Sequence, residues 1–262
     1  MNKELEAAKQ TALKAGKIIL DFYEKKNFTV EDKGGHYQNY LTEADKASEK
    51  LIEELLSKQF PDYGFRGEET ANEPSEKRFV WIVDPLDGTK GFVNHTNFFG
   101  VQIGLTKNGE VVLGVVYLPV FKELFWAVKG KGAFLNDKKI SVSKRKEPTD
   151  LKLAVSVRAL HDENLKQLFD KIKTTHRKYS DSLAYKWTCI ARGESDAHLV
   201  KPNSSAEWDI CAPKIIVEEA GGKVTTFSGK KVTFNRNRIN YPEGILVSNK
   251  LFHKELLKVL ND

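Results

Sequence analysis

The chain has 262 residues, of which 40% are apolar and 30% charged, so it can bury a substantial core and is not a disordered protein. Its net charge of +6 comes from lysines and arginines spread along the chain, which favours anionic ligands but predicts no specific nucleic-acid partner. The start is polar and helical rather than a signal peptide, and no apolar run is long enough to span a membrane. Because the two cysteines, Cys189 and Cys211, form no paired motif, we expect reduced thiols in a cytoplasmic protein.

Two amphipathic helices are predicted at the N-terminal end. Apolar residues recur at helical spacing over residues 5–22 and again over residues 44–55. Thr42 and Asp45 stand three residues apart at the start of the second helix, as in a capping box. A helix cap is therefore the structural role expected for this pair.

A predicted strand over residues 79–83 runs into the segment Asp84-Pro85-Leu86-Asp87-Gly88-Thr89. Two carboxylates at a rigid strand end suit Mg²⁺, which prefers compact oxygen ligands and shares them with substrate phosphates. The proline should turn the chain out of the strand and leave the Leu86 carbonyl as a further oxygen ligand. Gly88 and Thr89 should open a short helix whose N–H groups suit a phosphate. Taken alone, the segment is equally consistent with an ordinary strand-to-turn exit.

Two further acidic segments bear on the metal interpretation. Glu68 and Glu69 follow a short extended segment and place paired carboxylates near the same predicted turn. Asp209 stands at a predicted helix start, where it would serve either as an N-cap or as a ligand. The context therefore favours a metal site without fixing the role of Asp209.

The pattern changes to β and then to alternating α/β after the acidic segment. Strands over 101–105, 111–117 and 124–128 form a predicted meander, with an Asn108-Gly109 hairpin turn. The polar stretch 141–150 is the best boundary, giving an N-terminal half, 1–145, and a C-terminal half, 146–262. After it, a strand is expected over 153–157, followed by helices over the ranges 163–173, 183–192 and 212–220.

The chain resembles the inositol monophosphatase superfamily of Mg²⁺-dependent, lithium-sensitive phosphatases. The resemblance rests on four segments in order: Gly67-Glu68-Glu69, Asp84-Pro85-Leu86-Asp87-Gly88-Thr89, Trp208-Asp209 and Glu219-Ala220-Gly221-Gly222. It covers nearly the whole chain and implies an α+β fold, a layered α-β-α-β-α sandwich. It further implies two or three Mg²⁺ ions, with lithium as an inhibitor, and a monomer or homodimer.

The resemblance also implies roles for individual residues. It implies metal ligation by the side chains or carbonyl of five residues, Glu68, Asp84, Leu86, Asp87 and Asp209. Glu69 would support these ligands or a third ion. Asp45 and Thr89 would take the proton from the attacking water, with Glu68 counted among the catalytic residues. The amides of Gly88 and Thr89 would hold the phosphate, and Asp209 would also contact the substrate.

The substrate is expected to carry a second phosphate. Where inositol monophosphatases have a sugar-binding Glu, this chain has Val200, or Lys201 if one residue is inserted. Lys186 lies earlier in the chain, on a predicted helix. Together with the Asp87-Gly88-Thr89-Lys90-Gly91-Phe92 segment, the positions of these two lysines resemble the sequence pattern of the 3'(2'),5'-bisphosphate nucleotidase branch. The segment before Lys186 has one residue more than that pattern. The resemblance thus implies that the chain removes the 3'-phosphate of adenosine 3',5'-bisphosphate, giving AMP.

Three alternatives stay open. The first is the substrate of another member of the superfamily, namely inositol phosphate, histidinol phosphate or fructose 1,6-bisphosphate. In a chain with this many lysines, Lys186 and Lys201 are also consistent with ordinary solvated side chains. A more distant alternative is a nucleotide-binding protein that kept the fold and lost the chemistry, although scaffolding alone requires no set of oxygen ligands at metal spacing.

Overall fold

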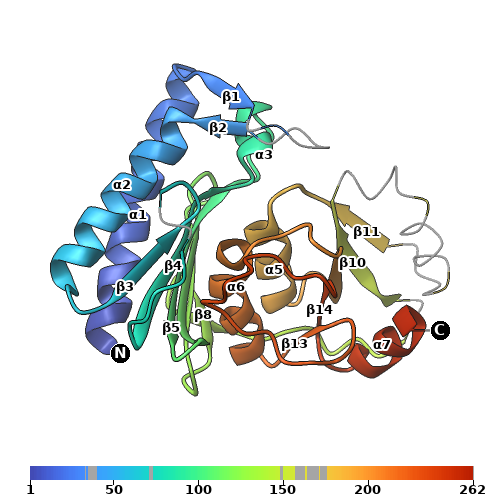
Figure 1. Ribbon diagram of the computed structural model, residues 1–262. Helices are drawn as coiled ribbons and strands as arrows, with labels where there is room; N and C mark the ends of the chain where they lie inside the picture. The colour runs from blue at the N-terminus through green and yellow to red at the C-terminus, as the bar shows by residue number, and fades with distance from the viewer. Residues whose placement is uncertain are drawn as a thin grey trace.

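The computed structural model describes residues 1–32, 34, 40–70, 73–147, 150–156, 163, 171 and 176–261. Two long helices, α1 (Asn2–Lys25) and α2 (Glu43–Gln59), form the first layer, as predicted (Figure 1). The apolar stripe of α1 is buried from Leu5 to Ile19 and half-buried at Phe22, whereas the most buried line of α2 includes Asp45, Ser48 and Glu49. This line is offset by one residue from the apolar positions that predicted the helix, because polar side chains of α2 serve the site described below.

The second layer is a seven-stranded sheet with the order β3-β4-β5-β6-β7-β8-β9. The strands are β3 (Gly64–Gly67), β4 (Phe79–Asp87), β5 (Gly100–Lys107), β6 (Glu110–Leu118), β7 (Glu123–Val128), β8 (Ala133–Leu135) and β9 (Lys138–Ile140). β3 pairs with β4 in parallel, and the later pairs are antiparallel. Asn108 and Gly109 have positive φ angles of 51° and 76°, which confirms the predicted hairpin turn.

Helices α5 (Leu183–Ala191) and α6 (Glu207–Glu219) form the middle layer (Figure 1). Beyond them lies a five-stranded sheet with the order β11-β10-β12-β14-β13. Its strands are β11 (His176–Tyr179), β10 (Lys152–Val155), β12 (Ala197–Val200), β14 (Ile245–Ser248) and β13 (Lys223–Thr226), and α7 (His253–Asn261) covers the outer side. The architecture is thus the expected α-β-α-β-α sandwich.

A short helix and a small ribbon complete the described elements. Strands β1 (Val30–Asp32) and β2 (Tyr40–Thr42) pair antiparallel near α3 (Thr89–Val93), the short helix predicted after the acidic turn (Figure 1). The expected helix over 163–173 and the end of the strand expected over 153–157 lie outside the described residues. The division into halves at residue 145 stays a prediction, with residues 141–147 running irregularly between β9 and β10.

Two glycines bring α6 close to the first sheet. Gly104 on β5 pairs with Gly114 on β6. A Cβ at Gly104 would lie 2.5 Å from Cys211 Sγ, and one at Gly114 would collide with the carbonyl oxygen of Ala212. The absence of side chains therefore lets the first half of α6 lie directly on the strands.

Both free thiols, of Cys189 and Cys211, are buried, as expected. Within the described residues, no helix has both the length and the apolar composition to cross a membrane.

Candidate functional site

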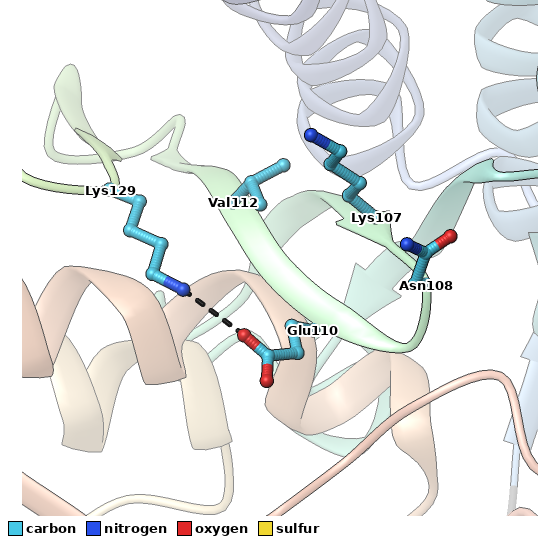
Figure 2. A pocket seen from close by; sticks show the side chains of 5 residues that line it. All are labelled: Lys107, Asn108, Glu110, Val112 and Lys129. Atoms are coloured by element: carbon cyan, nitrogen blue, oxygen red, sulfur yellow. Dashed lines mark hydrogen bonds and ion pairs between the residues drawn. The ribbon is translucent and has the colours of Figure 1, made fainter.

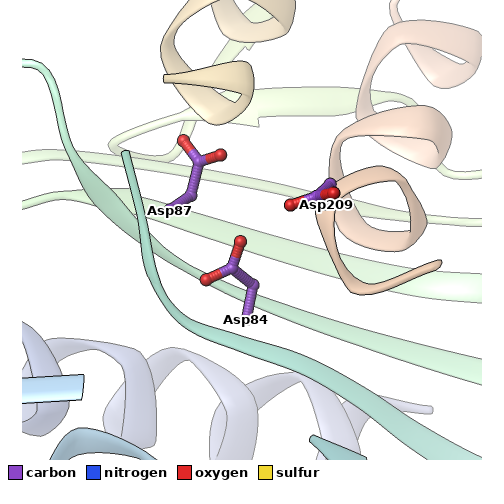
Figure 3. A group of neighbouring side chains, drawn as sticks. All are labelled: Asp84, Asp87 and Asp209. Atoms are coloured by element: carbon purple, nitrogen blue, oxygen red, sulfur yellow. The ribbon is translucent and has the colours of Figure 1, made fainter. Parts of the chain in front are cut away.

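Strand β4 carries two acidic residues of the site. Asp84 is 1% exposed and Asp87 is 5% exposed. The expectation that Pro85 ends the strand is wrong, because β4 continues to Asp87 with an irregular register between Asp84 and Asp87. The proline cannot donate to the ladder, so the strand accommodates it as a bulge. The bulge lets both carboxylates point to the middle layer of the sandwich (Figure 3).

Asp209 comes to the same place from the first turn of α6. The helix is capped by Ala206, so Asp209 stands at the third helical position and is not the N-cap. Its Oδ2 accepts a hydrogen bond of 2.6 Å from the Ala206 amide, which fixes the side chain at the helix start. One carboxylate oxygen from each of Asp84, Asp87 and Asp209 lies within 4.8 Å of the others (Figure 3). We call these three residues the aspartate cluster.

The aspartate cluster is electrostatically unfavourable without a cation. Burial raises the pKa of Asp84 well above its usual value, and the negative charges of Glu68, Asp87 and Asp209 raise it further. Burial and the charge of Asp87 raise the pKa of Asp209 to about 7. Oxygen donors crowded in this way fit a hard divalent cation, whose charge would offset their repulsion. Mg²⁺ is therefore a chemically suitable ion for this donor set.

Asp87 is held by the start of α5. Its carboxylate accepts hydrogen bonds from the Ser182 hydroxyl and from the amides of Leu183 and Ala184, the last two at 3.0 Å and 2.9 Å. Ser182 is also the N-cap of α5, since its Oγ accepts from the Tyr185 amide at 3.0 Å. The sequence prediction missed Ser182, although a Ser immediately before a predicted helix is a recognisable capping signal.

Asp45 and Thr89 lie together, as the resemblance implied. Thr89 Oγ1 lies 3.2 Å from Asp45 Oδ1 and 3.0 Å from the carbonyl oxygen of Leu86. The other oxygen of Asp45 accepts from the Thr42 amide at 2.8 Å and from its hydroxyl at 2.6 Å, so the predicted cap is present. Between the strand and α3, Gly88 has φ 82°, and a Cβ there would lie 2.7 Å from the Phe98 carbonyl oxygen. This turn therefore requires glycine.

Glu68 lies half-buried just beyond the end of β3, close enough for its charge to raise the pKa of Asp84. The following residues are held by Glu49, which is fully buried on α2. Glu49 accepts from the Glu69 amide at 2.9 Å and from the Thr70 hydroxyl at 2.5 Å. The sequence prediction missed Glu49, and its only signal was its place four residues after Asp45, on the same face of α2.

The two lysines predicted to bind substrate differ in their surroundings. Lys186 on α5 is 4% exposed. Burial raises the pKa of both Asp87 and Asp209, and the positive charge of Lys186 partly offsets this rise, so Lys186 lies beside the aspartate cluster. Lys201 is half-buried just after β12, and its carbonyl oxygen accepts from the Ser204 hydroxyl at 2.8 Å. Contact of either lysine with a substrate stays a prediction.

An open surface pocket of about 420 Å³ lies at the turn between β5 and β6 (Figure 2). Its lining side chains include Lys107, Glu110 and Lys129, and Lys129 Nζ lies 3.1 Å from Glu110 Oε2. No residue of the aspartate cluster lines it. The pocket is therefore separate from the site that carries the acidic chemistry.

Comparison with known proteins places this arrangement in a family. The model of the inositol monophosphatase family matches residues 1–262. The chain is 35% identical to the inositol-1-monophosphatase of Caulobacter vibrioides, with 98% of each chain aligned. It is 34% identical to the fructose-1,6-bisphosphatase/inositol-1-monophosphatase of Aquifex aeolicus, over 99% of this chain and 96% of that protein. A histidinol-phosphatase of Chlorobaculum parvum is 32% identical, over 100% of this chain and 98% of the relative.

Solved structures agree with the sequence relatives. The extragenic suppressor protein suhB of Bartonella henselae superimposes with a TM-score of 0.85 and 31% identity, over 99% of both chains. An IMPase of Thermotoga maritima superimposes with a TM-score of 0.84 and 30% identity, over 100% of this chain and 97% of that one. With this match over its full length, the chain belongs to the inositol monophosphatase family and is a phosphatase of that family.

Proposed function

We propose that the protein hydrolyses the phosphate monoester of a small phosphorylated alcohol with the help of Mg²⁺. The substrate class is that of inositol phosphate, fructose 1,6-bisphosphate and histidinol phosphate, after which the relatives are named. The observation that carries the proposal is the aspartate cluster, three carboxylates within 4.8 Å of one another beside the Thr89–Asp45 hydrogen bond.

Different residues would hold the metal, take up the proton and bind the phosphate. Mg²⁺, as two or three ions, would be held by the aspartate cluster together with Glu68 and the Leu86 carbonyl. Bound there, it would lower the pKa of water and neutralise charge on the phosphate and on the leaving oxygen. Asp45 accepts the proton of the Thr89 hydroxyl, so this pair takes up a proton from the attacking water at Thr89 Oγ1. The amides of Gly88 and Thr89 bind the phosphate.

A second candidate is the 3'(2'),5'-bisphosphate nucleotidase activity, with adenosine 3',5'-bisphosphate as substrate. The observation that favours it is the buried ammonium group of Lys186 beside Asp87 and Asp209, together with the apolar Val200. A cation there suits a second phosphate better than a polyol. We place this activity second because the relatives are named for inositol phosphate, fructose bisphosphate and histidinol phosphate.

The test is phosphate release in Mg²⁺ buffer from inositol 1-phosphate, fructose 1,6-bisphosphate, histidinol phosphate and adenosine 3',5'-bisphosphate, with kcat/KM compared directly. A preference of about a hundredfold corresponds to about 3 kcal/mol in transition-state binding and identifies the substrate class. A preference for the nucleotide would reverse our order of the two candidates.

The same assay tests the chemistry. Removal of Mg²⁺ with a chelator and the Asp87→Asn variant should each abolish hydrolysis, and Li⁺ should inhibit it. Glu110→Gln, in the surface pocket of Figure 2, is the matched control and should remain fully active. Activity that persists in Asp87→Asn would come from a contaminant, and the nucleotide-binding alternative would then replace the phosphatase.

A further inference from the structure

A buried ion pair joins the edge strand of the first sheet to the middle layer of the sandwich. Arg66 on β3 and Glu207 on α6 are both fully buried, and Arg66 Nη1 lies 2.9 Å from Glu207 Oε2. The same guanidinium donates to the carbonyl oxygen of Arg236 at 2.9 Å. Glu207 also accepts from Arg236 Nε at 3.0 Å and from the Asn235 amide at 2.7 Å. The carboxylate is therefore anchored from three sides.

Each partner of the ion pair stands two residues before an acidic residue of the site. Arg66 precedes Glu68, and alternate residues of an extended chain share one face. Arg66 pairs with Ile82, which lies on the face of β4 that carries Asp84. On α6, Glu207 and Asp209 share the first turn. The ion pair thus ties together the two segments that bring Glu68 and Asp209 towards Asp84.

The Arg66–Glu207 ion pair opposes the repulsion between the carboxylates of the aspartate cluster. One carboxylate oxygen from each member of the aspartate cluster lies within 4.8 Å of the others, so their like charges repel and act to move the start of α6 away from the sheet. A buried ion pair contributes little net stability, because desolvation of both charges offsets their attraction, but it does fix geometry. Its place beside the site therefore points to a role in alignment.

We propose that Arg66 and Glu207 are positioning residues that hold Glu68 and Asp209 at the spacing that Mg²⁺ requires. This inference rests on the metal site of the proposed function. It extends the site by two residues that contact neither the ion nor the substrate.

The experiment is a Mg²⁺ titration of the full chain by isothermal calorimetry, with thermal stability measured in parallel. In Arg66→Met the dissociation constant for Mg²⁺ should rise by about 10- to 100-fold, the usual effect of losing a residue that orients metal ligands. Arg66→Lys keeps the charge without the planar fork and should fall between wild type and Arg66→Met. Arg192→Met is the control, since it removes an ion pair with Glu123 at 2.7 Å from the opposite end of α5 to the one that holds Asp87.

The double variant Arg66→Met/Glu207→Gln separates alignment from stability. It removes the buried carboxylate that Arg66→Met leaves with Arg236 as its charged partner, so it should recover part of the thermal stability lost in Arg66→Met while still binding Mg²⁺ weakly. Wild-type affinity in Arg66→Met, equal weakening in Arg192→Met, or recovered affinity in the double variant would each overturn the inference. If Arg66→Met does not fold, Arg66→Lys and the double variant decide the question. Failure of the wild type itself to bind Mg²⁺ would refute the proposed metal site.

Discussion

Asp84 is a buried acidic residue beside other carboxylates. It is 1% exposed, it is surrounded by other carboxylates, and its Oδ2 accepts from Gln102 Nε2 at 3.3 Å. Asp84→Asn should therefore raise the melting temperature of the metal-free protein, because it removes a buried, repelled charge. The same change should abolish Mg²⁺-dependent hydrolysis. A melting temperature lower than that of wild type, measured by calorimetry in chelator, would contradict this account of the cluster.

The Thr89 hydroxyl offers a second test at the scale of one residue. Thr89→Val keeps the shape of the side chain and removes the hydrogen bond to Asp45. If this pair takes up the proton, kcat should fall by about 10²- to 10⁴-fold with little change in KM. Thr96→Val removes a comparable hydroxyl, which donates to the Gly91 carbonyl at 3.2 Å, and should leave kcat near the wild-type value. Equal kcat in both variants would exclude Thr89 from the reaction.

The sequence predicts a site residue only where residues close to it in the chain indicate its role. Asp84, Asp87 and Thr89 form one contiguous motif, and together with the acidic segments at Glu68-Glu69 and Asp209 it favours a metal site. Glu49 and Arg66 act through contacts with segments distant in the chain, and each looks locally like an ordinary charged residue of a helix or strand. No periodicity distinguishes them from solvated charges, so only the tertiary structure could find them.

Helix α6 determines the spacing of the site at the scale of elements. It lies on Gly104 and Gly114, where a side chain would meet Cys211 or the Ala212 backbone. Gly114→Ala should therefore push α6 outward, at a cost of about 1–3 kcal/mol in the free energy of unfolding. Because Asp209 moves with α6, the affinity for Mg²⁺ should also fall. Gly130→Ala is a control for destabilisation without a clash: its φ of 76° makes the substitution strained, but a Cβ there meets nothing within 4 Å, so the Mg²⁺ affinity should stay unchanged.

The elements predicted incorrectly at their ends are those that carry the site. Strand β4 continues past Pro85, where a turn was expected, and α6 begins at Glu207, two residues before the helix start expected at Asp209. In both places, polar residues occupy buried positions that hydrophobic periodicity assigns to solvent. The hairpin at Asn108-Gly109, which has no role in the site, follows its local propensity and was predicted correctly.

At the scale of the whole molecule, buried histidines should make stability depend on pH. His253 is 1% exposed, its ring nitrogens lie 2.8 Å from Thr225 Oγ1 and 2.8 Å from Ser248 Oγ, and burial lowers its pKa to about 4. Burial also lowers the pKa of His198 well below its usual value. An unfolded histidine titrates near pH 6.5, so the unfolded state binds more protons below that pH. These histidines therefore destabilise the fold as pH falls from about 6.5 towards 4.

Urea unfolding of wild type and His253→Gln across this range measures the effect. The raised pKa values of Asp84 and Asp209 act in the opposite direction, so the difference between the two proteins is the relevant quantity. That difference should change by up to about 1.4 kcal/mol per pH unit below pH 6.5 and stay constant above it. A difference that does not vary with pH would show that His253 is protonated in the folded protein.

The overall architecture was predictable because motifs along the full chain carry the family resemblance. The layered sandwich and the meander follow from that resemblance and from clear periodicity. The specificity of the phosphatase does not, because it depends on which side chains from different segments converge around a substrate. The spacing of residues along the chain does not show which side chains meet around a substrate in the folded protein.

The aspartate cluster has a consequence for the order of folding. Asp84 and Asp209 come from opposite halves of the chain and meet only when α6 has settled on Gly104 and Gly114. A partly folded chain lacking this docking has no complete binding site for the ion. Mg²⁺ should therefore leave the refolding rate nearly unchanged and slow the unfolding rate. Mg²⁺ would therefore bind in the last step of folding and be released in the first step of unfolding.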